Sequence, residues 1–390
     1  MTLEEARPLP PGKASRPRAS RVVVLLACAL AACAPARPAA AVPLFSSDGS
    51  CQGCHSAPPQ LNAAGMRFLE NGYRLPDSAV AIPAHARSLP VSVAGLVDYG
   101  ETRSGGAITS RKGDLRSVDL RSLGPLSDRL AFDLAATLDP DSHLLAARTA
   151  YVQLDDAVRA AGVNVRVGAF EGDAPYLSDD RRPTVAEYLS PIDLEAHGIE
   201  INGEAAAWTY GAGLVNSRRI AHLRVGSHPL NRLEDTYYWV YRDLFGQRIG
   251  ARMLFDRQDS NLRTLAWLQH LQAQGSALLE MGRLQLIPAY TFERFDDRPR
   301  AGNHARQQFG LLQAIAPFGR EGRWVLTARA EHEYKTKTDF TPEQDRSLEV
   351  LDFAFYSSHH LREALECARS GDNVGGPPQT NVNLSLYVSY

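Results

Sequence analysis

The sequence predicts a mainly β protein, a membrane barrel of antiparallel strands with a small helical domain before it. From residue 88 onward, apolar and polar residues alternate in segments about ten residues long, separated by turns rich in Gly, Pro and Asp. The mean hydropathy is −0.26, although 44% of the residues are hydrophobic. Barrel strands have this property because their apolar side chains alternate with polar ones instead of forming long runs.

The first 41 residues have the pattern of a secretory signal peptide. Three arginines precede an uncharged apolar run at residues 22–34, and three alanines follow at 39–41. A positive segment, a short apolar segment and a small-residue cleavage site are the parts of such a signal. The run is shorter than the roughly 20 residues that a membrane helix needs. A retained lipid anchor on Cys33 is the alternative, because residues 30–33 resemble a bacterial lipoprotein cleavage box.

The charge balance argues against a nucleic-acid partner. The chain holds 42 basic and 44 acidic residues. Six of the basic and two of the acidic residues lie in the first 41, so the rest of the chain carries a net charge of −6. A nucleic-acid-binding protein would need a basic stripe instead.

The five cysteines are too unevenly placed to form a disulfide scaffold. Cys28 and Cys33 lie in the signal region. Cys51 and Cys54 form a close pair, and Cys367 stands alone more than 300 residues later. The close pair is therefore the part of this set that can carry chemistry.

Residues 51–55 read Cys-Gln-Gly-Cys-His, the C-x-x-C-H attachment motif of c-type haem. Thioether bonds from Cys51 and Cys54 hold the porphyrin edge, and the adjacent His55 can then ligate the iron as proximal ligand. The alternatives are half of a zinc site and a redox dithiol. Residues 56–84 contain no second Cys/His pair for zinc, and a thioredoxin-like dithiol belongs to a βαβ unit, which this Ser-, Pro- and Gly-rich stretch does not resemble. We therefore predict one covalently bound haem c.

Two residues are candidates for the sixth ligand of the haem iron. Met66 follows His55 by eleven residues, and a Met opposite the proximal His would raise the reduction potential. His85 is the alternative distal ligand. Packing of Met66 against the porphyrin, without ligation, explains its position equally well.

The segment 59–73 predicts a helix that covers one face of the haem. The residues expected to pack on the porphyrin are Leu61, Gly65, Phe68 and Tyr73, with Leu69 on the same stripe. This haem domain spans 42–87, and about 45 residues are too few to bury a haem alone. Another part of the chain must therefore cover it.

The region 88–390 has two interpretations, a soluble sandwich with an apolar core or a membrane barrel with an apolar outside. The polar faces of the strands carry charges of both signs, as a water-filled lumen would. Aromatic residues at 237–239, 290 and 292 resemble the interfacial girdles of a barrel. The last ten residues alternate without exception and end on Tyr390, as the sorting signal of outer-membrane barrels does. These observations favour the barrel.

The 303 residues of this region accommodate about 16 antiparallel strands, with 14 as the alternative, since an even number is expected. Side chains alone do not fill the lumen of a barrel with sixteen strands. Segments 171–184, 296–304 and 338–346 are predicted to be outer loops. His359, Glu363 and Cys367 are spaced for one face of a loop helix at 358–370, where they would either bind a metal or remain solvated.

The chain resembles the fused outer-membrane monohaem cytochrome–porins, including the iron-oxidising ones of Gram-negative bacteria. The haem motif, directly after the signal, carries the resemblance most specifically, and residues 165–168 and the closing strand are similar at the level of pattern. The matching residues after the motif are Leu61, Asn62, Gly65, Phe68, Asn71, Gly72 and Tyr73. The resemblance implies a single-haem plug in the periplasmic mouth or lumen of a porin, which passes electrons from an external donor to periplasmic carriers. No iron-binding set of the family can be matched here.

We therefore expect electron transfer across the bacterial outer membrane by one haem c in a porin-like barrel. The expected partners are extracellular Fe(II) or another external donor, a periplasmic c-type cytochrome as carrier, and outer-membrane lipid. The protein would be an Fe(II)-oxidising cytochrome or an electron carrier. The alternatives are a diffusion porin with a structural or sensory haem plug, and a soluble exported β-rich cytochrome.

Overall fold

The computed structural model describes most of the chain from residue 55 onward. The described residues are 55–58, 60–70, 73, 91–139, 144–158, 162–172, 177–178, 182–189, 194–217, 235–245, 247–258, 268–297, 304–319, 322–336, 343–358, 361–372 and 376–389. The predicted signal peptide at 1–41 and the predicted haem ligands Cys51, Cys54 and His85 lie outside these residues.

The N-terminal part consists of three short elements. Strands β1 (His55–Ala57) and β2 (Gln60–Leu61) form a two-stranded sheet, in which His55 pairs with Leu61. Helix α2 (Ala63–Glu70) follows directly. The side chain of Asn62 accepts a hydrogen bond from the backbone amide of Gly65 at 2.9 Å, which is the geometry of a helix N-cap. In the described part of the chain, no helix is long and apolar enough to cross a bilayer.

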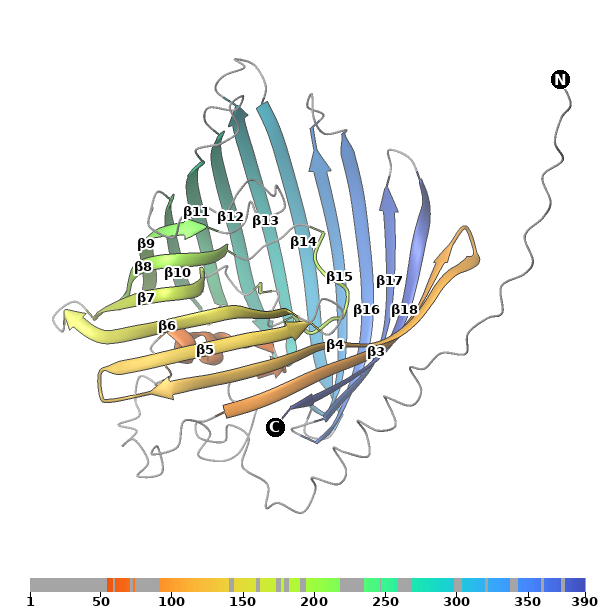
Figure 1. Ribbon diagram of the computed structural model, residues 1–390, viewed down its shortest axis with the longest axis horizontal. Coiled ribbons are helices and arrows are strands. Elements are labelled where there is room, and N and C mark those ends of the chain that lie inside the picture. The colour runs from red at the N-terminus through yellow and green to blue at the C-terminus, as the bar shows by residue number, and fades with distance from the viewer. Residues whose placement is uncertain are drawn as a thin grey trace, which may run out of the picture. The chain divides into compact units, whose positions relative to one another are not determined.

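The remaining strands close into one barrel (Figure 1). Each strand pairs antiparallel with its neighbour in the sequence, and β18 pairs with β3 to close the cylinder, with Leu384 opposite Tyr99. The sixteen described strands confirm the predicted number. They are β3 (Val91–Ser104), β4 (Ala107–Pro125), β5 (Leu130–Asp139), β6 (Leu144–Val158), β7 (Val163–Gly172), β8 (Leu194–Ala205), β9 (Trp208–Ser217), β10 (Asp235–Leu244), β11 (Gln247–Gln258), β12 (Leu268–Met281), β13 (Leu284–Asp297), β14 (His304–Phe318), β15 (Trp324–Lys335), β16 (Gln344–Ser358), β17 (Leu361–Asp372) and β18 (Gly376–Ser389).

The two faces of the barrel wall have opposite chemistry. Along β15, Trp324 and Leu326 are exposed on the outside, whereas Thr327, Arg329 and Glu331 are buried on the inside. An apolar outer face and a polar inner face, in a cylinder with no free strand edge, are the arrangement that a lipid environment requires. The membrane-barrel prediction is therefore confirmed, and the soluble sandwich is wrong.

The two ends of the barrel differ in the length of their connections. Tight connections join β8 to β9, β10 to β11, β12 to β13, β14 to β15 and β16 to β17 at one end, which we call the short-turn end. The antiparallel order brings the last residue of β18 to the same end. The long connection between β7 and β8 starts at the opposite end.

Three sequence predictions about this region are wrong in detail. Tyr237 and Trp239 are 0% and 3% exposed and face the lumen, and only Tyr238 between them faces outward. The period of two along a strand requires this, because adjacent residues point to opposite faces. The segment 358–370 is not a loop helix, since residues 361–372 form β17. The predicted outer loop 171–184 is corrected below.

Candidate functional site

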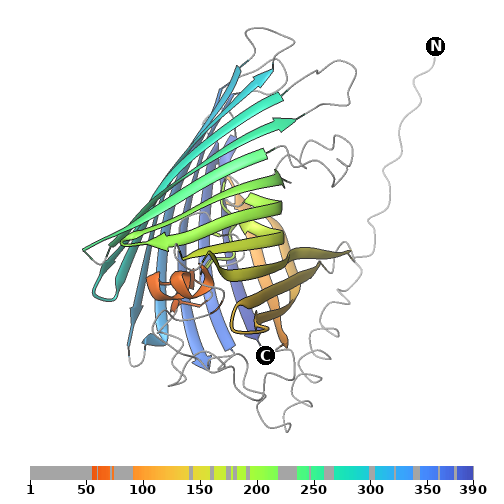
Figure 2. The ribbon, with the colours of Figure 1, turned by 90° about the vertical axis from the view of Figure 1, so that its left-hand side faces the viewer.

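Helix α2 lies inside the barrel at the short-turn end (Figure 2). The carboxylate of Glu70 accepts a hydrogen bond from the Arg248 guanidinium at 2.8 Å, and both side chains are almost fully buried. Arg67 forms a second, more exposed ion pair with Asp243 at 3.4 Å. Arg248 and Asp243 flank the tight turn between β10 and β11, so this turn fixes the height of the helix in the lumen.

Three further hydrogen bonds join Glu70 and the nearby Tyr73 to β5 and β6. The Tyr73 hydroxyl donates to the carboxylate of Asp133 at 2.5 Å and lies 2.8 Å from the Tyr151 hydroxyl. Arg121 of β4 holds the same Asp133 carboxylate through two hydrogen bonds. The Gln153 amide donates to the carbonyl of Glu70 at 3.1 Å. The helix is therefore tied to two separate parts of the wall.

A third attachment holds the segment before the helix. The hydroxyl of Tyr356, near the end of β16, donates to the carbonyl oxygen of Pro58 at 2.6 Å. Pro58 follows β1, and His55 is the first residue of that strand. The residues next to the predicted haem attachment site are thus bound to the wall at the short-turn end.

Met66 provides apolar contacts that hold α2 in the lumen. It is 2% exposed and belongs to a cluster of buried side chains that come mostly from the inner face of β12 to β17. The buried members are Met66, Leu177, Tyr188, Leu278, Ile287, Ala289, Phe309, Leu311, Ile315, Val325, Ala354 and Ala364. Leu61 and Ala63 pack against the same cluster. We call this group the lumen cluster.

Burial has the largest effect on the pKa of Glu70. Burial raises the pKa of the Glu70 carboxyl above its ordinary value, and the charge and hydrogen bond of Arg248 act in the opposite direction. A buried ion pair is costly to break from one side only, by about 3–5 kcal/mol, because the remaining charge has lost its partner. Glu70 and Arg248 therefore specify one position of α2.

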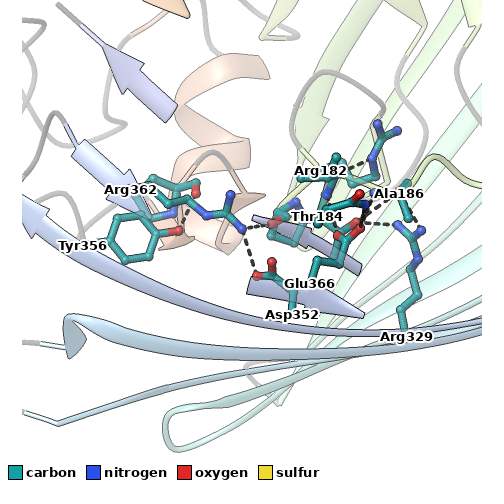
Figure 3. A network of polar contacts seen from close by, with 12 residues as sticks. Arg182, Thr184, Ala186, Arg329, Asp352, Tyr356, Arg362 and Glu366 are labelled. Atoms are coloured by element: carbon teal, nitrogen blue, oxygen red, sulfur yellow. Dashed lines mark hydrogen bonds and ion pairs between the residues drawn. The ribbon is translucent and has the colours of Figure 1, made fainter. Parts of the chain in front are cut away.

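A second segment, residues 182–189, also lies in the lumen, where charged wall residues bind its backbone (Figure 3). Glu366 of β17 accepts hydrogen bonds from the amides of Val185 and Ala186 at 2.6 and 2.9 Å. Arg329 of β15 donates to the Thr184 hydroxyl and to two successive carbonyls, at 2.7–3.1 Å. We call residues 182–189 the inner segment.

Further wall residues bind the backbone of the inner segment. The amide of Leu189 donates to Glu331 at 2.7 Å, and the carbonyl of the same residue accepts a bond from Arg346. Arg362 donates to the carbonyl of Pro183 and to Asp352. Leu177 and Ser178 of the same connection are 0% and 1% exposed. The described part of the predicted outer loop 171–184 is thus folded inward, because lumen charges satisfy its backbone groups.

The part of the wall formed by β6 to β11 carries inward-facing aromatic rings. Tyr237, Trp239 and Tyr241 follow one another on the inner face of β10, and they pack with Tyr151 and Phe170. Each of the three rings lies over a glycine of a neighbouring strand, where a Cβ atom would collide with it. Glu200 accepts bonds from the Tyr237 hydroxyl and from the Trp239 indole, the latter at 3.0 Å.

The residues predicted to pack on the haem differ in exposure, since Gly65 and Tyr73 are buried and Leu61 and Phe68 are not. His55 and Leu61 lie side by side in the β1–β2 pairing. Phe68 follows Met66 by two residues and so points about 200° away around the helix. One face of α2 is therefore buried against the wall, while Leu61 and Phe68 stay partly exposed and Phe68 packs edge-on against Tyr73. Among the described residues, no group of three His, Cys, Asp or Glu side chains is placed to hold a metal ion.

The structure brings together several residues that the sequence analysis did not single out, chiefly Glu70, Arg248, Arg329 and Glu366. A sequence signal exists for two of them, since Arg329 and Glu366 are charged residues flanked on both sides by apolar neighbours in their strands. The sequence pattern places them on an inner face, but it does not indicate which inserted segment they bind.

The fold and the lumen define a sixteen-stranded barrel of the outer-membrane type. No family model and no curated relative matches this sequence. Solved structures with a similar fold include an anion-selective porin from Comamonas acidovorans, at 13% identity and a TM-score of 0.57, covering 78% of this chain and 100% of that chain. Another is the outer membrane channel DcaP of Acinetobacter baumannii, at 11% identity and a TM-score of 0.55, covering 78% and 98%. A third is the loop L8 deletion mutant of OmpT, an outer membrane protein of Vibrio cholerae, at 11% and 0.54, covering 77% and 99%. The chain therefore has the fold of outer-membrane porins.

Proposed function

We propose that this porin-type barrel carries one covalently attached haem c at its short-turn end and passes electrons across the bacterial outer membrane. The donor would be external Fe(II) or another extracellular reductant, and the acceptor a periplasmic c-type cytochrome. The observation that carries the proposal is the attachment to the barrel wall of the residues that directly follow the C-x-x-C-H motif. That chain is bound inside the lumen through Pro58, Glu70 and Tyr73.

Each part of the N-terminal segment has a role in this proposal. Cys51 and Cys54 attach the porphyrin, and His55 ligates its iron. When bound, the haem supplies a one-electron Fe(II)/Fe(III) couple. Leu61 and Phe68, which stay partly exposed, would exclude water from its face, and the Glu70–Arg248 pair holds the segment at a fixed height.

In this proposal the barrel wall shields the haem from water, which a 45-residue domain cannot do alone. A small domain exposes too much of its haem to water, and the barrel wall covers the segment on several sides. The hydrocarbon band of an outer membrane is about 25 Å tall and resists electron transfer. A redox centre held within the polar lumen shortens that barrier, whereas a separate periplasmic cytochrome does not.

Met66 and His85 remain the two candidates for the distal position. Met66 lies in the lumen cluster, where packing accounts for its burial. Its side chain lies on the opposite side of α2 from Phe68, so it can ligate the iron only if the haem lies on the wall side of the helix.

Proteoliposomes test the proposal. An oxidised c-type cytochrome is enclosed, and a reductant coupled to a polymer too large for any pore is added outside. We expect reduction of the enclosed cytochrome with the wild type and none with the Cys51→Ser, Cys54→Ser double variant. Equal rates for both proteins would contradict electron transfer through the haem.

The second candidate is a diffusion porin in which the haem is a structural or sensory plug. The comparisons favour this candidate, because the neighbours are porins and outer-membrane channels. In the same vesicles, a diffusion porin admits small solutes but leaves the enclosed cytochrome oxidised when the reductant is polymer-bound.

A further inference from the structure

Helix α2 and the inner segment share one apolar core inside the barrel. The lumen cluster contains Met66 of the helix together with Leu177 and Tyr188 of the β7–β8 connection. Leu189 of the inner segment packs against the same cluster. The two insertions come from parts of the chain more than 100 residues apart. The inner segment also packs, through Ala186 and Leu189, against a second buried group of wall residues, Leu348, Val350 and Ala368.

The wall side chains of this cluster are almost fully buried. Leu278, Ile287 and Ile315 point inward and are only 0–1% exposed. In a barrel of sixteen strands, side chains from the wall alone leave the lumen open. Met66, Leu177 and Tyr188 of the inserted chain pack in this cluster and contribute to its cover.

Arg329 links the polar and the apolar parts of this arrangement. Its guanidinium donates to the carbonyls of Ala186 and Glu187, and it stacks at 4.5 Å on the ring of Tyr188. The backbone of the inner segment is thus fixed by the charged wall, while the Tyr188 ring is turned into the lumen cluster. Helix α2 covers the cluster with Met66 and is itself fixed by Glu70.

We infer that α2 and the inner segment form a single two-part plug that closes the lumen to dissolved solutes, and that displacing either part loosens the other. The Glu70–Arg248 pair holds one part, and the contacts of Arg329 and Glu366 hold the second. The lumen cluster couples them, because each part covers apolar surface that the other would otherwise expose to water. The plug lets the barrel accommodate an electron carrier without leaking solutes.

Conductance in planar bilayers tests the closure. We expect the full wild-type chain to insert without a stable ohmic step, and Glu70→Ala and Glu366→Ala each to raise the mean conductance at least tenfold. Arg67→Ala is the matched control on the same helix, because its partner Asp243 is partly exposed and such pairs contribute little. A wild-type conductance equal to that of the Glu366→Ala variant would overturn the closure.

Thiol labelling tests the coupling between the two parts. In a Cys367→Ser background, Ala186→Cys places a thiol on the inner segment, and a small water-soluble methanethiosulfonate is the probe. We expect Glu70→Ala and Arg248→Ala to raise the labelling rate at least tenfold, although neither residue bonds to the inner segment in the described contacts. An unchanged rate would mean that the two insertions are independent, and the inference would fail.

These outcomes separate the plug from the electron-transfer proposal. A closed wild-type barrel without covalent haem refutes the proposed function and leaves the plug in place. A conducting wild-type barrel that holds haem and reduces the enclosed cytochrome refutes the plug alone.

Discussion

Glu70 and Arg248, 178 residues apart in the sequence, form an ion pair of 2.8 Å inside the barrel, with side chains only 4% and 1% exposed. This pair joins the segment that follows the haem motif to the barrel wall. The position of the segment that follows the motif is therefore set by a wall residue far away in the sequence.

The first prediction concerns this pair. Glu70→Ala leaves the buried Arg248 with weaker partners, and we expect the local free energy of opening of α2 to fall by about 3–5 kcal/mol. Amide hydrogen exchange of residues 63–70 measures that free energy. Glu70→Gln keeps a hydrogen-bond acceptor of the same shape and is expected to lose less. Equal exchange in the wild type and in the Ala variant would show that the pair does not seat the helix.

The second prediction concerns Tyr73 and alkaline pH. Burial raises the pKa of the Tyr73 hydroxyl well above its ordinary value of 10.0, and Tyr151 and Asp133 act in the same direction. Because the folded state holds this proton more tightly, its contribution to stability is complete below pH 10 and is lost as the pH rises through the folded pKa. We expect the protection of α2 against exchange to fall above pH 10 in the wild type. A Tyr73→Phe variant should lose this dependence, and an unchanged slope would contradict the assignment.

The third prediction concerns the aromatic wall. A Cβ atom at Gly213 would occupy the space of the Tyr237 ring, whereas one at Gly310 meets no atom within 4 Å. Gly213→Ala is therefore expected to destabilise the barrel by about 1–3 kcal/mol through overpacking, and Gly310→Ala is its control. Urea unfolding, followed by the gel mobility of the folded barrel, compares the two variants. A Gly310→Ala variant as unstable as Gly213→Ala would mean that the ring is not the cause.

The fourth prediction separates ligation from packing at Met66. Met66→Leu conserves volume and keeps the lumen cluster filled, so its cost in stability is expected to stay below about 1.5 kcal/mol. If Met66 ligates the iron, the substitution lowers the midpoint potential of the haem and changes its spectrum. A separate His85→Ala variant serves as the comparison. An unchanged spectrum for Met66→Leu would remove Met66 as the distal ligand.

Most of the barrel was predictable from the sequence because its signal is local. Alternation along residues such as Trp324 to Glu333 reports directly which side chain meets lipid and which meets the lumen. The closing strand follows the same rule, with Leu384 and Leu386 exposed on the outside. The number of strands then follows from the length of the region.

The inner segment was not predictable in the same way. The inward position of residues 182–189 depends on Glu366, Arg329 and other charges that are distant in the sequence. The spacing of Glu363 and Cys367 illustrates a second reason. Residues four apart share a face both in a helix and in a strand, so the spacing did not exclude β17.

One short motif predicted the chemistry of the N-terminal segment. It did not predict how that segment is held in the barrel. The motif identifies Cys51, Cys54 and His55 by spacing alone. The pairing of Glu70 with Arg248 and of Tyr73 with Asp133 depends on how the closed wall places β5, β6, β10 and β11 around the helix.

The most direct test of a haem-bearing barrel is a gel of the purified, detergent-solubilised protein, run with and without heating. We predict one band whose mobility changes on heating, as a folded barrel requires, and which keeps peroxidase staining after heat denaturation because the porphyrin is bonded to Cys51 and Cys54. A heat-modifiable band without any staining would leave a porin-type barrel and contradict the haem.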